Sequence, residues 1–173
     1  MDQRHFQLFA RGFDLGLKAF ALVTIVISLM VGYALLFLNG EVTFSFTAPV
    51  FSLFRSYETP STQLVSNMSA IVGFCSALID SFLLFRGSQV CARISQGQTP
   101  FTTENYRVIK QIAIILLIVS LVEPLVYSLL VTIGMEKGYY IVFGLGYQTF
   151  MGILVYLIAE IIHYGSLESG VNE

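Results

Sequence analysis

Three acidic residues, Asp80, Glu123 and Glu160, fall inside long apolar stretches of the chain. An ionised carboxyl costs about 2.5–3.5 kcal/mol at the centre of a membrane helix, so such residues usually face other helices and have partners. Acids in this setting can bind a cation, a proton or a polar ligand. They can also serve only as structural ion pairs and hydrogen bonds between helices, and this second interpretation is the one we favour.

Asp80 and Glu160 both fall near the predicted cytoplasmic ends of their helices. Asp80 precedes Arg86 by six residues, which is about 9 Å along a helix. The basic and amide side chains expected within reach at this edge are Lys18, Arg107, Lys110 and Gln111. Salt bridges that tie the helix ends together are the favoured interpretation, and a cytoplasm-facing cation, proton or ligand site is the alternative.

Glu123 lies deeper, 13 residues beyond Lys110, or about 20 Å along a helix. Pro124 follows it and removes the backbone hydrogen bond to the carbonyl of Ser120. Tyr127 lies one turn further along, on the same predicted face. We favour a protonated carboxyl that donates to the freed carbonyl or to a polar side chain at its depth. The alternative is a carboxylate in a water-filled cavity that binds a proton or a ligand.

The sequence holds no pattern typical of catalysis or metal binding. G-x-S-x-G, H-E-x-x-H, a Walker loop and G-x-G-x-x-G are all absent. His5 and His163 lack the spacing to cysteines or carboxylates that metal sites use. If one helix carries Cys75 and Cys91, they lie about 24 Å apart, too far for a disulfide. We therefore expect free thiols, no cofactor, no metal and no enzymatic activity.

The composition is that of an integral membrane protein. Of 173 residues, 55% are hydrophobic and 12% are charged, against about 25% charged in soluble domains. The mean hydropathy is +0.77. A lipid bilayer is therefore the expected surrounding. The net charge of −2 provides no basic surface, so we expect no direct contact with nucleic acid.

Hydropathy predicts one all-α membrane domain over residues 1–173, a four-helix bundle. The stretches long enough to cross a core of about 30 Å are 18–38, 64–86, 109–134 and 139–164. Residues 1–17 carry an apolar stripe at helical spacing and predict a short helix in the membrane interface. Residues 39–63 form the predicted extracytoplasmic loop, and residues 87–108 form a cytoplasmic corner between the second and third spans.

The long loop contains two local patterns. Val42, Phe44 and Phe46 alternate with polar residues, which favours an extended segment. Residues 50–57 follow Pro49 and predict one or two helical turns on the lipid headgroups. So aromatic a loop is expected to rest on the bilayer or on a partner.

The Lys and Arg residues predict the orientation. Seven lie by the N-terminal segment and the corner: Arg4, Arg11, Lys18, Arg86, Arg93, Arg107 and Lys110. The opposite loops hold only Arg55 and Lys137. Because positive charges concentrate on the cytoplasmic side, both termini and the corner are predicted to be cytoplasmic.

A faint internal repeat is also present. Residues 17–29 resemble 109–121, and 78–80 resemble 157–160. Apolar stretches match easily by chance, which is one explanation. The other is a tandem repeat of two parallel helical hairpins about an axis along the membrane normal, with Asp80 and Glu160 in related places.

The corner has strong local signals. Gly97 is suited to end the second helix, and Thr102 is suited to cap the third. Phe101 and Tyr106 occupy the two positions of a hydrophobic staple around that cap. Asn105 lies at the third helical position, from which its side-chain oxygen can reach back to the backbone amide of the cap. The corner is therefore predicted to be a rigid helix–turn–helix rather than a slack linker.

The corner also resembles a family signature. The residues that carry the resemblance are Ile94, Gly97, Pro100, Phe101 and Asn105, followed by an Ile-rich span. They resemble the corner of a bacterial family of small four-span membrane proteins, typified by the YoaS-like proteins, that carry a domain of unknown function. The close of the last span is similar too, at Ile158, Ala159, Glu160, Gly165, Leu167 and Glu168. The resemblance covers residues 88–168. It implies a bacterial cytoplasmic membrane protein, often encoded beside a small helix-turn-helix regulator, with no established activity.

Two functions follow from these patterns. The leading hypothesis is a non-catalytic inner-membrane protein that binds or regulates a cytoplasmic regulatory protein through Gly97, Pro100, Phe101, Thr102 and Asn105. The alternative is a small transporter or channel-like protein that uses Asp80, Glu123, Glu160 and Tyr127. A polar cavity reaching Glu123 would favour transport, and a dry bundle with an exposed apolar patch would favour partner binding. Small residues at Thr24, Ser28 and Gly32 allow close helix packing, and we also expect a homodimer.

Overall fold

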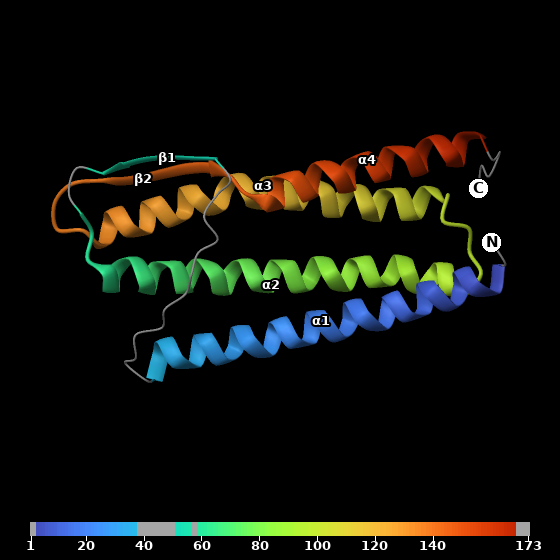
Figure 1. Cartoon of the computed structure of the whole chain (residues 1–173), viewed down its shortest axis with the longest axis horizontal. Helices are drawn as coiled ribbons and strands as arrows, with labels where there is room; N and C mark the ends of the chain where they lie inside the picture. The colour runs from blue at the N-terminus through green and yellow to red at the C-terminus, as the bar shows by residue number, and fades with distance from the viewer. Residues whose placement is uncertain (1–2, 38–50, 57–58, 169–173) are drawn as a thin grey trace.

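The computed structural model describes residues 3–37, 51–56 and 59–168. The elements in chain order are α1 (Gln3–Phe37), β1 (Phe51–Ser56), α2 (Thr62–Ser95), α3 (Thr103–Gly134), β2 (Tyr140–Leu145) and α4 (Tyr147–Glu168) (Figure 1). All four of these helices are long and apolar enough to cross a membrane. The prediction of four helices able to span a membrane is therefore confirmed, and these helices indicate a multi-pass membrane protein. The alternating pattern at 42–46 lies outside the described residues.

α1 is one continuous helix of 35 residues, so a separate interfacial helix over 1–17 was a wrong prediction. Nothing between the two predicted parts breaks the helix, because Lys18 simply continues the turn and pairs with Asp14 at 2.9 Å. α1 runs antiparallel to α2, and the small residues predicted to allow close packing lie on the side of α1 that faces α2. Ser28 is buried, and a Cβ added at Gly32 would lie 3.2 Å from the ring of Phe74.

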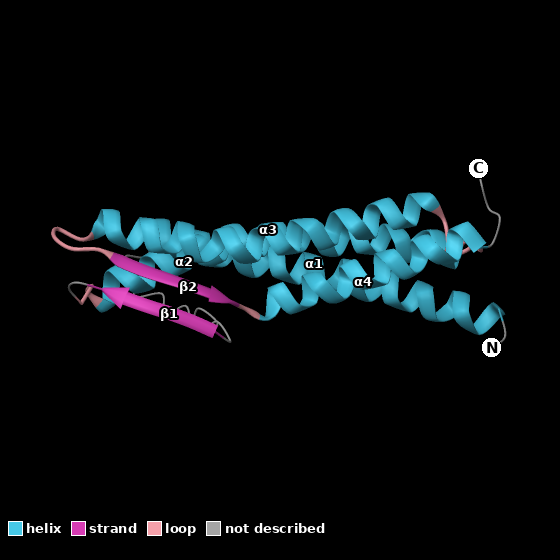
Figure 2. Cartoon of the chain, turned by 90° about the horizontal axis from the view of Figure 1, so that it is seen from above, coloured by secondary structure: helices cyan, strands magenta, loops and turns pink. Residues whose placement is uncertain are grey.

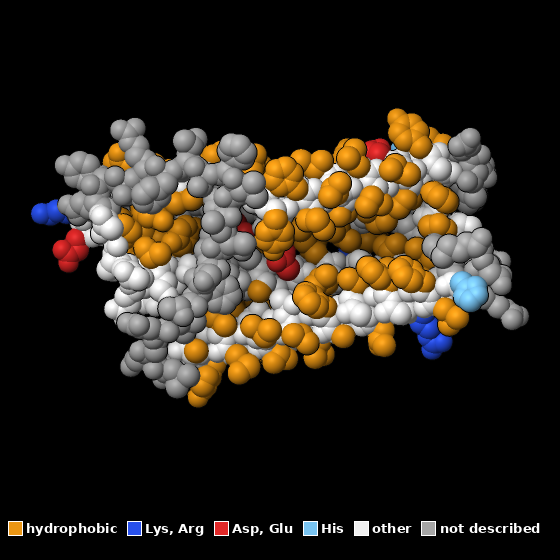
Figure 3. Space-filling model, viewed as in Figure 1, with side chains coloured by type: hydrophobic (Ala, Val, Ile, Leu, Met, Phe, Trp, Pro, Cys, Tyr) orange, Lys and Arg blue, Asp and Glu red, His pale blue; other side chains and the backbone are white. Residues whose placement is uncertain are grey.

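The helices pack in chain order. α1 lies along α2, α3 lies along α4, and the two hairpins meet where α2 contacts α3 (Figure 1). Apolar side chains cover the outer faces of these helices, as a membrane protein requires (Figure 3). Acidic side chains are visible in the hollow between the hairpins, surrounded by this apolar surface.

A two-stranded antiparallel sheet replaces helix at two predicted places. β1 pairs with β2 from Phe51 opposite Leu145 to Ser56 opposite Tyr140. Helical turns over 50–57 were therefore a wrong prediction. The prediction of a fourth span that begins at residue 139 was also wrong. Residues 140–145 form β2, and α4 begins after it, at Tyr147 (Figure 2).

The sequence of β2 explains the strand. Its residues are YIVFGL, with Val142 and Gly144 buried and their neighbours exposed, the period of two that a strand shows. β-branched and aromatic residues favour this conformation, whereas Gly144 and Gly146 weaken a helix. α3 spans 32 residues, which is about 48 Å, so β2 and the shorter α4 lie along it one after the other.

Two hydroxyl groups of α3 hold β2 in place. The hydroxyl of Ser128 accepts from the backbone N–H of Val142 at 2.8 Å and also lies 3.0 Å from its carbonyl. The hydroxyl of Thr132 makes the same pair of contacts with Tyr140, both at 3.0 Å. Four helical residues rise about 6 Å and two strand residues about 6.8 Å, so the spacings match. The hydroxyls thus satisfy backbone groups that a bilayer would leave unpaired.

Candidate functional site

The corner is built as its sequence predicts at both helix ends. Gly97 has a φ of +94°, the left-handed conformation in which glycine closes a helix. The side-chain oxygen of Thr102 accepts from the backbone N–H of Asn105 at 3.2 Å, so the predicted cap is confirmed. α3 begins at Thr103, directly after that cap.

Asn105 is fully buried and holds the turn from inside. Its side-chain N–H donates to the carbonyls of Thr99 and Pro100, each at 3.4 Å. The prediction that its oxygen reaches back to the cap amide was wrong, because that oxygen has no partner among the described residues. The turn leaves two carbonyls without helical partners, and the amide is turned toward them instead.

Both corner aromatics lie against α4. A Cβ added at Gly165 would fall 2.5 Å from the ring of Phe101, so only glycine allows this approach. Tyr106 stacks on His163 with ring centroids 4.5 Å apart. An ion pair of 2.6 Å between Arg93 and Glu104 spans the turn. These contacts fix the corner against the end of the last helix.

The surface that the corner presents is mixed in character. Phe101 remains 39% exposed. The other exposed side chains are Gln96, Gln98, Thr99, Glu104 and Arg107. An aromatic ring thus lies among polar groups and charges of both signs.

One of the predicted salt bridges is present at this edge. Lys110 donates to Glu160 at 3.1 Å and also to the hydroxyl of Tyr106, so α3 and α4 are joined. Arg86 instead donates to Gln111 at 3.1 Å, which joins α2 to α3. The structure therefore gives Glu160 a cationic partner.

Asp80 does not join this edge. Its carboxyl is hydrogen-bonded by the side chain of Gln148 and lies within electrostatic range of Glu123. The prediction that Asp80 forms a salt bridge at the cytoplasmic edge was wrong. α4 begins only at Tyr147, so its first turn, which carries Gln148, lies level with Asp80. The sequence expectation had placed the two acids at different depths.

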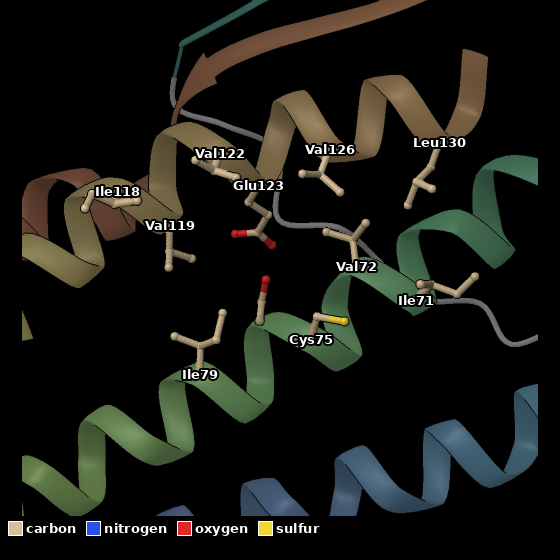
Figure 4. Close-up of a pocket in the computed structure, with 11 residues that line it drawn as sticks. Ile71, Val72, Cys75, Ile79, Ile118, Val119, Val122, Glu123, Val126 and Leu130 are labelled. Atoms are coloured by element: carbon tan, nitrogen blue, oxygen red, sulfur yellow. The ribbon is translucent and has the colours of Figure 1, made fainter. Parts of the chain in front are cut away.

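Glu123 points from α3 toward α2 (Figure 4). The hydroxyl of Ser76 on α2 hydrogen-bonds its carboxyl. Neither Glu123 nor Asp80 makes an ion pair within the described part of the chain. Ser76 and Asp80 are one helical turn apart on α2, a spacing from which the sequence alone could have placed both side chains on one face of that helix.

Tyr127 does not share this site. It is 5% exposed and packs edge-on against Tyr140 of β2, with centroids 5.8 Å apart. It belongs to a small core with Val72, Val131 and Val142 beneath the strand. Four residues rotate a helix by about 400°, so Tyr127 lies only about 40° around α3 from Glu123, but its ring packs against Tyr140 beneath β2 and is not part of the lining around Glu123.

A cavity of about 260 Å³ lies between α2 and α3 with Glu123 on its wall (Figure 4). Its other lining is nearly all aliphatic, including Ile79 on α2 and Val119 on α3. Cys75, a free thiol, also lines it. The cavity is thus an apolar groove with one carboxyl and one hydroxyl, and not a polar channel.

Searches of family models, curated proteins and solved structures give no match to this chain.

Proposed function

We propose that this chain is a non-catalytic protein of the bacterial cytoplasmic membrane that binds a cytoplasmic regulatory protein through the corner at 87–108. The observation that carries the proposal is the pre-formed turn around buried Asn105. Loops that carry function are typically held by a rigid scaffold. A surface already ordered before binding loses less conformational entropy when a partner docks.

The shape of the corner supports this proposal. α2 and α3 enter the corner, and α4 receives Phe101 at Gly165. The N-terminal part of α1 reaches it too, since a Cβ added at Gly97 would lie 3.4 Å from the side chain of Gln7. The count of Lys and Arg favours a cytoplasmic position for this surface and for both termini.

The pairing of α1 with α2 and of α3 with α4 is also compatible with the proposed tandem repeat. The apolar outer faces of α1 and α4 are the surfaces on which a homodimer would form.

A transporter or channel-like function is the second candidate. The observation in its favour is that Asp80 and Glu123 lie close together without a cationic partner among the described residues. A transport path, however, needs polar groups along its length, and the cavity at Glu123 is walled by aliphatic side chains. Partner binding is therefore the better-supported function.

Site-specific photo-crosslinking in the native host tests the proposal. A photoreactive residue at Gln98, which is exposed at the tip of the corner, is expected to capture a cytoplasmic protein. The same residue at exposed Lys137, in the opposite turn, serves as the matched control. The capture at Gln98 is expected to disappear when Asn105→Ala removes the support of the turn. No adduct at Gln98, or the same adduct at Lys137, would refute the proposal.

A further inference from the structure

We propose that the groove between α2 and α3 binds an amphiphilic amine, with its ammonium group at Glu123 and its alkyl chain along the aliphatic walls. This site is separate from the cytoplasmic corner, and its ligand differs in kind from a protein partner. The inference stands on the shape of the groove, on the charge at its wall and on its open side.

The groove suits a chain rather than a bulky ring system. Its volume is about 260 Å³, just below the range of about 300–1,000 Å³ that holds drug-sized ligands. Isoleucine and valine side chains from the two helices form its walls (Figure 4). An alkyl chain from the bilayer can pack against these walls by van der Waals contact.

In its ionised form, the carboxyl of Glu123 calls for a cationic partner. Among the described residues, the side chain of Gln148 hydrogen-bonds the carboxyl of Asp80, and the hydroxyl of Ser76 hydrogen-bonds that of Glu123, with Asp80 within electrostatic range. A carboxylate in a low-dielectric site is stable only with a compensating charge or several hydrogen bonds. The described residues supply no such charge, whereas an ammonium group would supply both a charge and N–H donors.

An organic cation fits better than a metal ion. Ca²⁺ takes six to eight oxygen ligands and Mg²⁺ about six. No group of three His, Cys, Asp or Glu side chains placed to hold a metal occurs in the described part of the chain. The walls beside Glu123 are aliphatic, so they cannot complete such a shell but can hold an alkyl chain.

The groove is open to the surrounding membrane. Ile118 and Val122 on its α3 rim are 55% and 46% exposed, and Ile71 on its α2 rim is 42% exposed. A ligand dissolved in the bilayer can therefore enter from the side. Two other occupants, an uncharged lipid chain and a second copy of this chain, are outcomes that the experiment separates.

Cys75 provides the measurement, because it lines the groove and its thiol is free and exposed. The Cys91→Ala protein is placed in zwitterionic nanodiscs at one copy per disc, and the rate of reaction with N-ethylmaleimide is measured. Dodecylamine is expected to slow the reaction about tenfold at nine times its Kd, because occupancy divides the rate by 1 + [L]/Kd. 1-Dodecanol, which has the same chain and no charge, is expected to leave the rate nearly unchanged.

Variants locate the cation. Glu123→Gln is expected to weaken protection by dodecylamine by about tenfold or more, since it removes a charge-assisted hydrogen bond. Glu123→Asp is expected to retain protection. Glu136→Gln, the same change at an exposed acid outside the groove, is the matched control. If Glu123→Gln alters the circular dichroism of the protein, Asp80→Asn provides the second test, with a smaller loss of protection expected.

Three results would overturn the inference. Equal protection by dodecanol would show that any lipid chain fills the groove. Protection that appears only in discs with two copies, with or without amine, would assign the groove to a second copy of this chain. No protection by dodecylamine at any concentration tolerated by the discs would mean that the groove does not take the amine.

Discussion

Ser128→Ala is expected to destabilise the protein by about 1–2 kcal/mol although it removes only one oxygen atom. The hydroxyl accepts from the N–H of Val142 at 2.8 Å and lies 2.7 Å from the carbonyl of Pro124. Without it the N–H of Val142 stays buried and unpaired, which costs about 1–3 kcal/mol. Alanine improves helix propensity by a few tenths of a kcal/mol, and single polar contacts in membrane proteins reach about 1.7 kcal/mol, so the lower part of that range is expected.

Reversible unfolding in mixed detergent micelles measures this change. Near-ultraviolet circular dichroism is the suitable signal, because Tyr127 and Tyr140 form an edge-on pair between α3 and β2. Ser120→Ala is the matched control, since Ser120 is equally buried on the same helix and its hydroxyl donates to the carbonyl of Leu117 one turn back. That variant is expected to stay within about 0.5 kcal/mol of the parent protein.

The comparison of the two serine variants tests whether the hydroxyl of Ser128 stabilises the protein through its contact with β2. If both variants lose the same free energy, the hydroxyl of Ser128 acts as a local helix contact and the pairing with β2 carries no stability. A Ser128→Ala, Thr132→Val double variant adds a second check. If the Ser128→Ala change already releases β2 as a unit, Thr132→Val is expected to lower the stability of the double variant by less than it lowers that of the parent protein.

Three further outcomes are expected. Thr102→Ala should lower stability by about 1 kcal/mol in a thermal melt in detergent, because it removes the cap of α3, and an unchanged melt would contradict the cap. Gly97→Ala should cost about 1–2 kcal/mol in the same melt, because alanine is strained at a φ of +94°, and a cost near zero would mean that the turn relaxes freely. A cysteine at Gln98 in a protein without native cysteines should resist a membrane-impermeant maleimide added to intact cells, whereas one at Lys137 should react. Labelling at Gln98 would reverse the proposed orientation.

Local signals made the corner predictable. Gly97 and Thr102 act through their own backbone conformation and through contacts within a few residues, so the sequence alone indicates where α2 ends and α3 begins. Lys110 and Glu160 were also expected near one another, because both lie close to the same predicted edge. Such features depend little on how distant helices are arranged.

The strand β2 was missed for a physical reason. Hydropathy measures whether a segment prefers lipid, and an apolar run that continues through β2 into α4 has the same hydropathy in either conformation. The signals that separate them are weaker: alternating burial at Val142 and Gly144, and two hydroxyl residues one turn apart on α3. Ser128 and Thr132 become informative only once the strand beside them is known.

The late start of α4 also explains why the acids were misplaced. A helix beginning near residue 139 would carry Gln148 well inside the last span, away from its first turn. Because β2 takes up residues 140–145, the first turn of α4 instead lies level with Asp80, and the side chain of Gln148 hydrogen-bonds that carboxyl. Glu123 is left with Ser76 on the side of the groove. The two acids therefore differ in their surroundings although they lie close together. Glu123→Gln and Asp80→Asn should accordingly affect amine binding to different extents, with the larger loss at Glu123.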